Sequence, residues 1–237
     1  MSNLWSRRAL WIVAGAVVVL AALAAGVWYY HAHRVPQFPI NSADNITNWV
    51  FTGPYSDNAA GKAQAQGDIA KNEAQLGKGQ YDDYDLYVDI GNDDTLLGNG
   101  AAAYAAYNHA SMIHPDQPVV YADLGHLMDL LGASHTAADA YAKAVAVAPG
   151  ILQLHVERLS FLTRAFSTDT PMVEAALKDA SDQFGATPAI LTIEAGWLET
   201  QGRYADAVKA WQADETLSPP ANAAAIETQI ARDKAKE

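Results

Sequence analysis

The stretch YADLGHLMDLLGASHTAADAYAKAVAVAP, residues 121–149, decides the fold of this chain. It holds two segments with apolar residues three or four positions apart, which is the spacing of one helix face. Gly132 separates the segments, and a residue just after the last turn of a helix often takes positive φ. Pro149 closes the stretch, because proline lacks an N–H and stops a helix. The stretch therefore predicts two helices joined by a turn.

The same pattern occurs three times in register. In this stretch its positions are Tyr121, Leu124, Gly125, Met128, Gly132, Ala137, Tyr141, Ala144 and Pro149. Thirty-four residues earlier stand Tyr87, Ile90, Gly91, Gly98, Ala103, Tyr107, Ala110 and Pro115. Seventy residues later stand Leu191, Ala195, Leu198, Gly202, Tyr204, Ala207, Trp211 and Pro219. A period of about 34 residues is typical of stacked helix pairs, and we expect the small residues to let paired helices approach and the aromatics to fill the gap to the next pair.

The three stretches resemble the tetratricopeptide repeat (TPR) and cover roughly residues 84–221. The resemblance implies an all-α, TPR-type α-solenoid of antiparallel helix pairs that binds other proteins and is not an enzyme. The tail is similar to the end of the TPR subunits that assist cytochrome c maturation, in Tyr204, Ala207, Trp211, Leu217, Pro219, Ile226 and Ile230. Those proteins are anchored in a membrane with periplasmic repeats, and they carry two membrane helices where this chain shows one.

Residues 9–30, ALWIVAGAVVVLAALAAGVWYY, predict one N-terminal transmembrane helix. The run is uncharged and close to the roughly 20 residues that cross a bilayer core. Arg7 and Arg8 precede it, and positive charge marks the cytoplasmic side. We therefore expect a single-pass protein of a bacterial inner membrane, with a cytoplasmic N-terminus and a periplasmic TPR domain. The alternative is a signal peptide cleaved after Ala22-Leu23-Ala24, which would leave an apolar new N-terminus.

The expected organisation follows from these features. The parts are 1–8 (cytoplasmic), 9–30 (anchor), 31–80 (linker with a helix over 59–76), 81–221 (TPR domain) and 222–237 (capping helix). The repeats are 84–117, 118–151, a degenerate 152–187, and 188–221. In the degenerate repeat, Thr170 is expected to cap the second helix with Pro171 at its first position.

Composition argues against several classes of function. The formal net charge of −12 is unsuited to nucleic acid, which needs clustered Lys and Arg. The absence of cysteine removes disulfides, thiolate sites and covalent haem attachment. His31 and His33 are interpreted as an interfacial pair, and the acidic cluster near Asp89 does not follow the EF-hand loop. We expect no catalytic residues, no metal and no cofactor.

In TPR arrays the first helix of each pair lines a groove, and the resemblance places the partner-binding residues there. These are Asp85, Val88, Asn92, Thr95, Leu96, Val119, Ala122, His126, Asp129, Leu130, Thr192, Gly196, Glu199 and Thr200. This set has no Lys, so capture of an acidic tail is disfavoured, and an extended or helical peptide that is apolar or basic fits better. Partners could instead dock on the other face or on the anchor.

Three functional hypotheses remain open from the sequence. The first is a chaperone-like scaffold that assembles an envelope complex, for which cytochrome c maturation is the nearest resemblance. The second is a permanent accessory subunit of a membrane protein complex. The third, from another class, is a periplasmic enzyme or metal carrier.

Overall fold

The computed structural model describes residues 37–236. The predicted anchor at 9–30 and the pair His31 and His33 lie outside these residues. Within the described part, no helix has the length and apolar character needed to cross a membrane.

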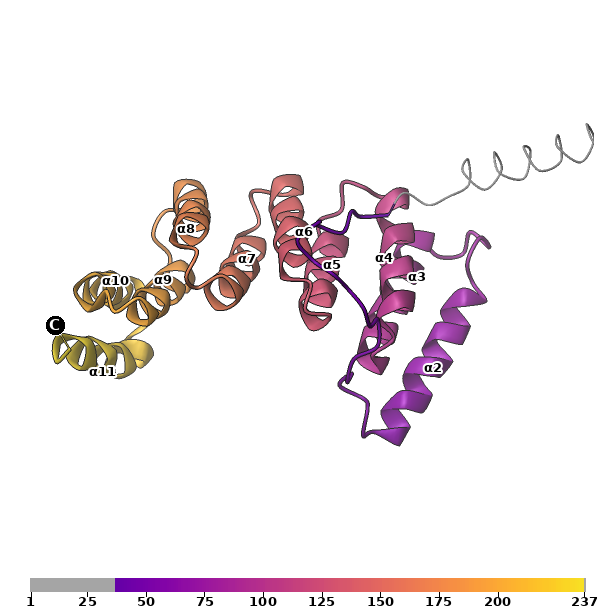
Figure 1. Cartoon of the computed structure of the whole chain (residues 1–237), viewed down its shortest axis with the longest axis horizontal. Coiled ribbons are helices and arrows are strands. Elements are labelled where there is room, and N and C mark those ends of the chain that lie inside the picture. Colours follow the sequence, from indigo (N-terminus) through magenta and orange to yellow (C-terminus); the bar gives the residue numbers. More distant parts are fainter. Residues whose placement is uncertain (1–36, 237) are drawn as a thin grey trace, which may run out of the picture. The chain divides into compact units, whose positions relative to one another are not determined.

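The described residues form an all-α fold of repeated helix pairs (Figure 1). Helix α2 comes first, at Ala59–Glu73. Four pairs follow: α3 (Asp83–Leu97) with α4 (Gly100–Ile113), α5 (Val119–Leu130) with α6 (Ser134–Val147), α7 (Leu152–Ala165) with α8 (Thr170–Phe184), and α9 (Pro188–Thr200) with α10 (Tyr204–Leu217). A short 3-10 helix, Pro220–Asn222, leads into α11, Ala223–Lys234.

The turns inside three pairs use glycine as the sequence predicts. Gly98, Gly132 and Gly202 have φ of +81°, +73° and +69°, a conformation that costs glycine little because it has no Cβ. The start of α8 differs from the sequence prediction. Asp169, not Thr170, caps this helix, and its carboxylate accepts the N–H of Met172 at 3.2 Å. Aspartate is at least as good an N-cap as threonine. Because the helix begins one residue earlier than predicted, Pro171 occupies its second position.

The helices of the first two pairs are held together by a glycine on one helix and a tyrosine on the other. A Cβ built on Gly91 of α3 would lie 2.4 Å from the Tyr107 ring of α4. A Cβ on Gly125 of α5 would lie 2.9 Å from the Tyr141 ring of α6. The tyrosines therefore pack inside their own pair, not only against the next one as we expected. Tyr141 does both, because its ring centroid is also 5.2 Å from that of Phe161 in α7.

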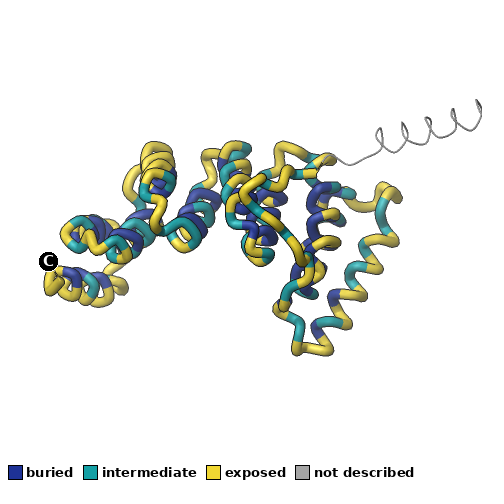
Figure 2. The backbone as a smooth tube through the Cα atoms, in the orientation of Figure 1, coloured by how far each residue is buried: buried dark blue, intermediate teal, exposed yellow. Residues whose placement is uncertain are grey.

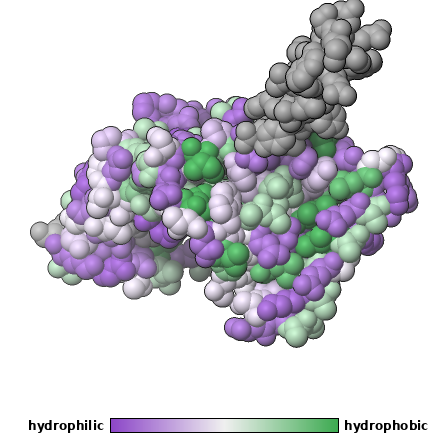
Figure 3. Space-filling view, turned by 45° about the vertical axis from the view of Figure 1, so that its right-hand side comes forward, coloured by the Kyte–Doolittle hydropathy of each residue, from purple (hydrophilic) through white to green (hydrophobic). Residues whose placement is uncertain are grey.

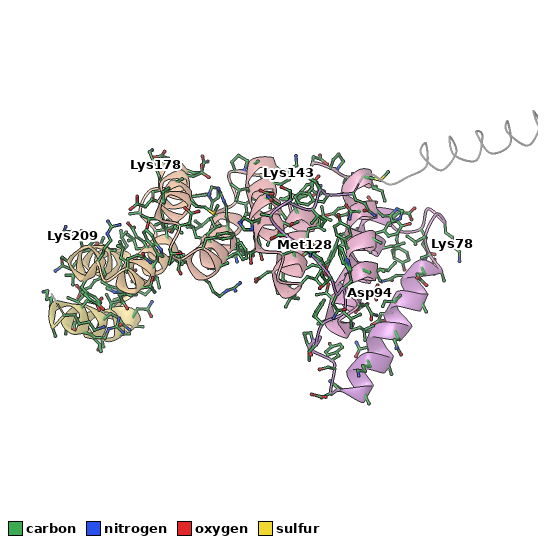
Figure 4. All side chains as sticks on the ribbon, viewed as in Figure 1. Lys78, Asp94, Met128, Lys143, Lys178 and Lys209 are labelled. Atoms are coloured by element: carbon green, nitrogen blue, oxygen red, sulfur yellow. The ribbon has the colours of Figure 1, made fainter. Side chains whose placement is uncertain are left out.

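One continuous apolar core runs along the pairs. Its fully buried members include Leu124, Met128, Leu159, Val173 and Ile190. Figure 2 shows the buried side of each helix turned towards its neighbours. Figure 4 shows Met128 in the packed interior, whereas Lys178 and Lys209 point outward. Each pair thus buries its apolar side on the next, as helical repeats do.

Residues 37–58, which we call the N-terminal arm, pack along the first two pairs. The arm crosses the α3–α4 turn, where the N–H of Phe51 donates to the carbonyl of Gly98 at 3.1 Å and that of Tyr55 donates to Leu96 at 3.1 Å. A Cβ on Gly53 would lie 2.3 Å from the Leu96 carbonyl oxygen, so the contact requires glycine. The sequence predicts a linker over 31–80, part of which docks through Ile46, Trp49, Val50 and Phe51; the structure shows that the arm packs on its own repeats, with Ile46, Trp49 and Phe51 against the core.

The arm also supplies a cap to a helix far away in sequence. The cap residue of α6, Ala133, makes no side-chain hydrogen bond. Instead Asp44 of the arm accepts the N–H groups of Thr136 at 2.6 Å and His135 at 3.3 Å, together with the Thr136 hydroxyl at 2.6 Å. Burial opposes the charge of Asp44, but these hydrogen bonds outweigh it and lower its pKa. The carboxylate thus satisfies donors that the end of a helix leaves free.

We expect Gly91→Ala to destabilise the protein. The added methyl group overlaps the Tyr107 ring, which costs about 1–3 kcal/mol and outweighs the gain of up to about 1 kcal/mol in helix propensity. Gly196→Ala is the matched control, because a Cβ there meets no atom within 4 Å, and it should stabilise by about 0.5–1 kcal/mol. Urea unfolding of the full chain in mild detergent, followed by circular dichroism, measures both. Equal effects of the two substitutions would contradict the packing described here.

We expect Asp44→Ala to lower the free energy of unfolding by about 1–2 kcal/mol, since two N–H groups of α6 lose their acceptor. Asp57→Ala, at an exposed position of the same arm, should change stability by less than about 0.5 kcal/mol. The same urea titration compares the two variants. No loss on replacing Asp44 would show that the arm does not cap α6 in solution.

Candidate partner-binding groove

A hollow of about 580 Å³ lies between α7, α9, α10 and α11. Its walls are mainly apolar and include Val156, Ile193, Trp211 and Ile226. Small exposed alanines, among them Ala189 and Ala225, stand at its margin. An open apolar hollow with a few polar groups is the usual character of a binding site.

Polar groups in this hollow come from two helices. Asp214 of α10 is 2% exposed and accepts hydrogen bonds from the hydroxyls of Thr192 at 3.0 Å and Ser218 at 2.6 Å. The Oε1 atom of Gln229 on α11 is buried and has no hydrogen-bond partner. A buried acceptor without a partner is unfavourable by about 1–3 kcal/mol. The side-chain amide of Gln229 is therefore placed to bind a donor that enters the hollow.

A second hollow of about 310 Å³ adjoins the first, because Val156 and Ser160 of α7 line both. It lies between α5, α6 and α7 and is more polar, with His126, Asp129, Glu157 and Arg164 in its walls. Arg164 forms an ion pair with Asp129. We call the two hollows together the groove. It spans the helices from α5 to α11.

Asp123 stands beside this polar end of the groove. Its Oδ2 atom is buried without a hydrogen-bond partner. Burial is the main cause that raises its pKa to about 7, and the nearby Glu157 carboxylate raises it further. A buried carboxylate next to a like charge favours either a proton or a cation as partner.

The structure places the predicted groove residues in three groups. His126, Asp129 and Thr192 line the groove. Val119, Leu130 and Thr200 are exposed, and Ala122 and Gly196 are partly exposed. Glu199 of α9 instead connects the last helices. It accepts the Trp211 Nε1–H of α10 at 2.9 Å and forms an ion pair with Arg232 of α11.

The residues predicted on the first repeat lie beside α2. Asp85 is exposed, Val88 and Leu96 are partly buried, and Thr95 is buried. Asn92 accepts the Tyr107 hydroxyl at 2.8 Å and, together with Asp89, Asp93 and three residues of α2, surrounds a small polar hollow. Helix α2 therefore packs on the face of α3 that the resemblance assigns to the groove. No signal in the sequence indicated that α2 would take this place.

Sequence reasoning missed the part of the groove that α10 and α11 supply. Asp214, Ala225 and Gln229 line the hollow, but the family pattern assigns partner contacts only to the first helix of each pair. The apolar spacing of Ile226 and Ile230 was the available signal, since it turns one face of α11 inward. Among residues 37–236, no three His, Asp or Glu side chains are grouped so as to hold a metal ion.

No protein-family model matches the chain, and no curated protein matches it in sequence. Solved structures do resemble its fold. The MamA protein superposes with a TM-score of 0.52 at 16% identity, over 65% of this chain and 82% of MamA. A thermophilic TPR protein of Thermus thermophilus superposes with a TM-score of 0.50 at 18% identity, over 73% of this chain and 92% of that protein.

The fold is therefore a TPR-like, all-α helical repeat. Both likenesses concern the backbone arrangement and leave the partner open, since one repeat scaffold carries many different grooves.

We expect stability to depend on pH through Asp123. Its pKa is raised to about 7 in the folded protein, above the roughly 3.9 of an unfolded chain, so the free energy of unfolding falls as pH rises between these values. Asp123→Asn should therefore stabilise the protein by about 1–3 kcal/mol near pH 8 and much less near pH 4. Asp116→Asn, at an exposed position, should have little effect at either pH. Urea titrations at both pH values provide the measurement; a gain that is the same at both would contradict the raised pKa.

Proposed function

We propose that this protein is a membrane-anchored, non-enzymatic scaffold that helps to assemble a protein complex of the bacterial envelope. In this proposal residues 9–30 hold it in the inner membrane and the helical repeats lie in the periplasm. The groove binds an extended or helical segment of a partner protein. The assembly process we propose is cytochrome c maturation, because the C-terminal sequence resembles the TPR subunits that assist it.

The observation that carries the proposal is the groove itself. Its larger hollow is apolar, open and about 580 Å³ in volume, and it continues into a polar hollow along α7. An elongated depression with an apolar end and a charged end suits a peptide segment better than a small round ligand. Stacked helical repeats commonly present such extended binding surfaces.

Charge indicates which segments would bind. Among the charged side chains that line the two hollows, Arg164 is the one permanent cation, and Asp129 neutralises it. Glu157 and Asp214 are acidic, and Asp123 lies next to Glu157. The chain as a whole carries a formal net charge of −12. Complementary charge therefore favours a partner segment with apolar and basic side chains.

Filling the hollow tests the proposal. Ala225 lies at the margin of the larger hollow, so Ala225→Trp should block it without disturbing the core. Ala231→Trp is the matched control, because this alanine is exposed on the same helix and does not line the hollow. Tagged full-length chains are purified in mild detergent, and the chains that co-purify are identified. We expect the Ala225 variant to retain the partner about tenfold less well, a loss of about 1.4 kcal/mol.

Equal retention by both tryptophan variants would overturn the groove as the binding site. If a fixed set of chains co-purifies with the wild-type protein, each in an amount equal to it, a permanent accessory subunit is favoured over an assembly factor. Recovery of the chain without any partner would contradict the scaffold function.

A further inference from the structure

Helix α2 has few attachments to α3, the helix that it covers (Figure 1). Of its 15 residues, Gly61 and Ala65 are buried. Within residues 37–236, no hydrogen bond or ion pair joins α2 to α3. The loop over 74–82 that connects the two helices is mostly exposed. It contains Gly77 and Gly79 at φ of +69° and +68°, and glycines of this kind let a loop bend. Contacts of small apolar groups therefore hold α2 in place.

The side of α3 that α2 covers carries two large apolar residues. Leu86 and Ile90 are buried, yet neither belongs to the core that runs along the pairs. Their spacing places them on one side of α3 with Asp89 and Asp93, which line a hollow together with residues of α2. Figure 3 shows hydrophilic side chains (purple) interspersed with hydrophobic ones (green) on the side of the molecule where α2 lies. A movement of α2 away from α3 would bring Leu86 and Ile90 into contact with water.

Negative charges from both helices meet across this contact. Asp68 of α2 and Asp89 and Asp93 of α3 line the same hollow, which has a volume of about 300 Å³. Glu73, the last residue of α2, adds another carboxylate close to α3. Lys71 lines the hollow as well, but it is exposed and forms no ion pair with any described residue. Like charges repel at such distances, so the ionised carboxylates oppose the docking of α2.

Asp93 links this repulsion to pH. Burial first, and then Asp68, Asp89 and Asp94, raise the pKa of Asp93 to about 6. The Tyr107 hydroxyl of α4 lies near the same carboxylates, and burial raises its pKa, so it adds no charge at neutral pH. When α2 moves away, Asp93 regains water and loses Asp68 as a neighbour, and its pKa falls towards about 3.9. The docked form therefore holds the proton more tightly, and docking weakens as pH rises between these two values.

We propose that α2 is a hinged cover of the first repeat that opens more readily at neutral pH than in mild acid. The arm stays attached during this motion, because the Tyr55 N–H donates to the Leu96 carbonyl just before α2. The exposed loop over 74–82 bends at the other end. Opening exposes Leu86 and Ile90 on α3, and acid closes the cover again. This motion concerns one helix contact and does not depend on the proposed scaffold function.

Hydrogen exchange of α2, measured by mass spectrometry on the full-length chain in mild detergent, tests the proposal. Wild type, Asp93→Asn and Asp68→Asn are compared at about pH 4.5 and about pH 7.5, on either side of the transition. Asp85→Asn is the matched control, because Asp85 is exposed on the same helix and does not line the hollow. Variants are compared at the same pH, so the intrinsic exchange rate cancels. Segments from α9 and α10 of the same molecules report on the rest of the fold.

We expect wild-type α2, relative to its intrinsic rate, to exchange about tenfold faster at the higher pH, since one pKa unit corresponds to a factor of ten. Asp93→Asn and Asp68→Asn should remove most of this difference, and Asp85→Asn should leave it. Equal protection of α2 at both pH values would overturn the proposal, as would an equal effect of Asp93→Asn and Asp85→Asn. A parallel change in α9 and α10 would show that the whole fold loosens, which also overturns it.

Discussion

The close contact between a bare glycine on one helix and a tyrosine ring on the next underlies this structure. At Gly91 and Gly125 the ring occupies the space where any other residue would carry its Cβ. This brings the two helix backbones of a pair close together and leaves the rest of each tyrosine free for other contacts. Tyr107 uses its hydroxyl to bond Asn92 at 2.8 Å, whereas Tyr141 reaches Phe161 of the next pair. At Tyr141, one residue therefore serves both helix pairing and stacking on the next pair.

The N-terminal arm adds a second constraint, of a different kind. It bonds the α3–α4 turn through backbone groups and the start of α6 through the Asp44 carboxylate. Because one segment is fixed to both pairs, the first two repeats are linked by more than their shared core. A cap contributed from 92 residues away is retained only if the arm is docked. The arm therefore belongs to the folded unit and is not a simple spacer.

Helices at the two ends of the row shape the surfaces beside the repeats. Helix α2 packs on α3 beside a cluster of carboxylates, where burial first, and then Asp68, Asp89 and Asp94, raise the pKa of Asp93 to about 6. Helix α11 instead forms one wall of the larger hollow while Ile226 and Ile230 anchor it to the core. Helix α2 thus covers an acidic face of α3, whereas α11 completes an apolar hollow. Two helices outside the repeat pattern thus line hollows at the two ends of the row.

The sequence by itself determined the helical repeats of this protein, because the signals are local. A period near 34 residues, a glycine after a helix and a proline at its end act within a few positions, so the turns at Gly98, Gly132 and Gly202 were predictable. Of the residues predicted to bind a partner, His126, Asp129 and Thr192 line the two hollows, and their role in binding stays a prediction. Glu199 forms an ion pair with Arg232 of α11, and α2 packs on the predicted face of α3. The apolar residues of the arm indicated that part of it docks, but only the tertiary structure decided these points and the surface on which the arm docks, because they depend on contacts between residues tens of positions apart that no local pattern encodes.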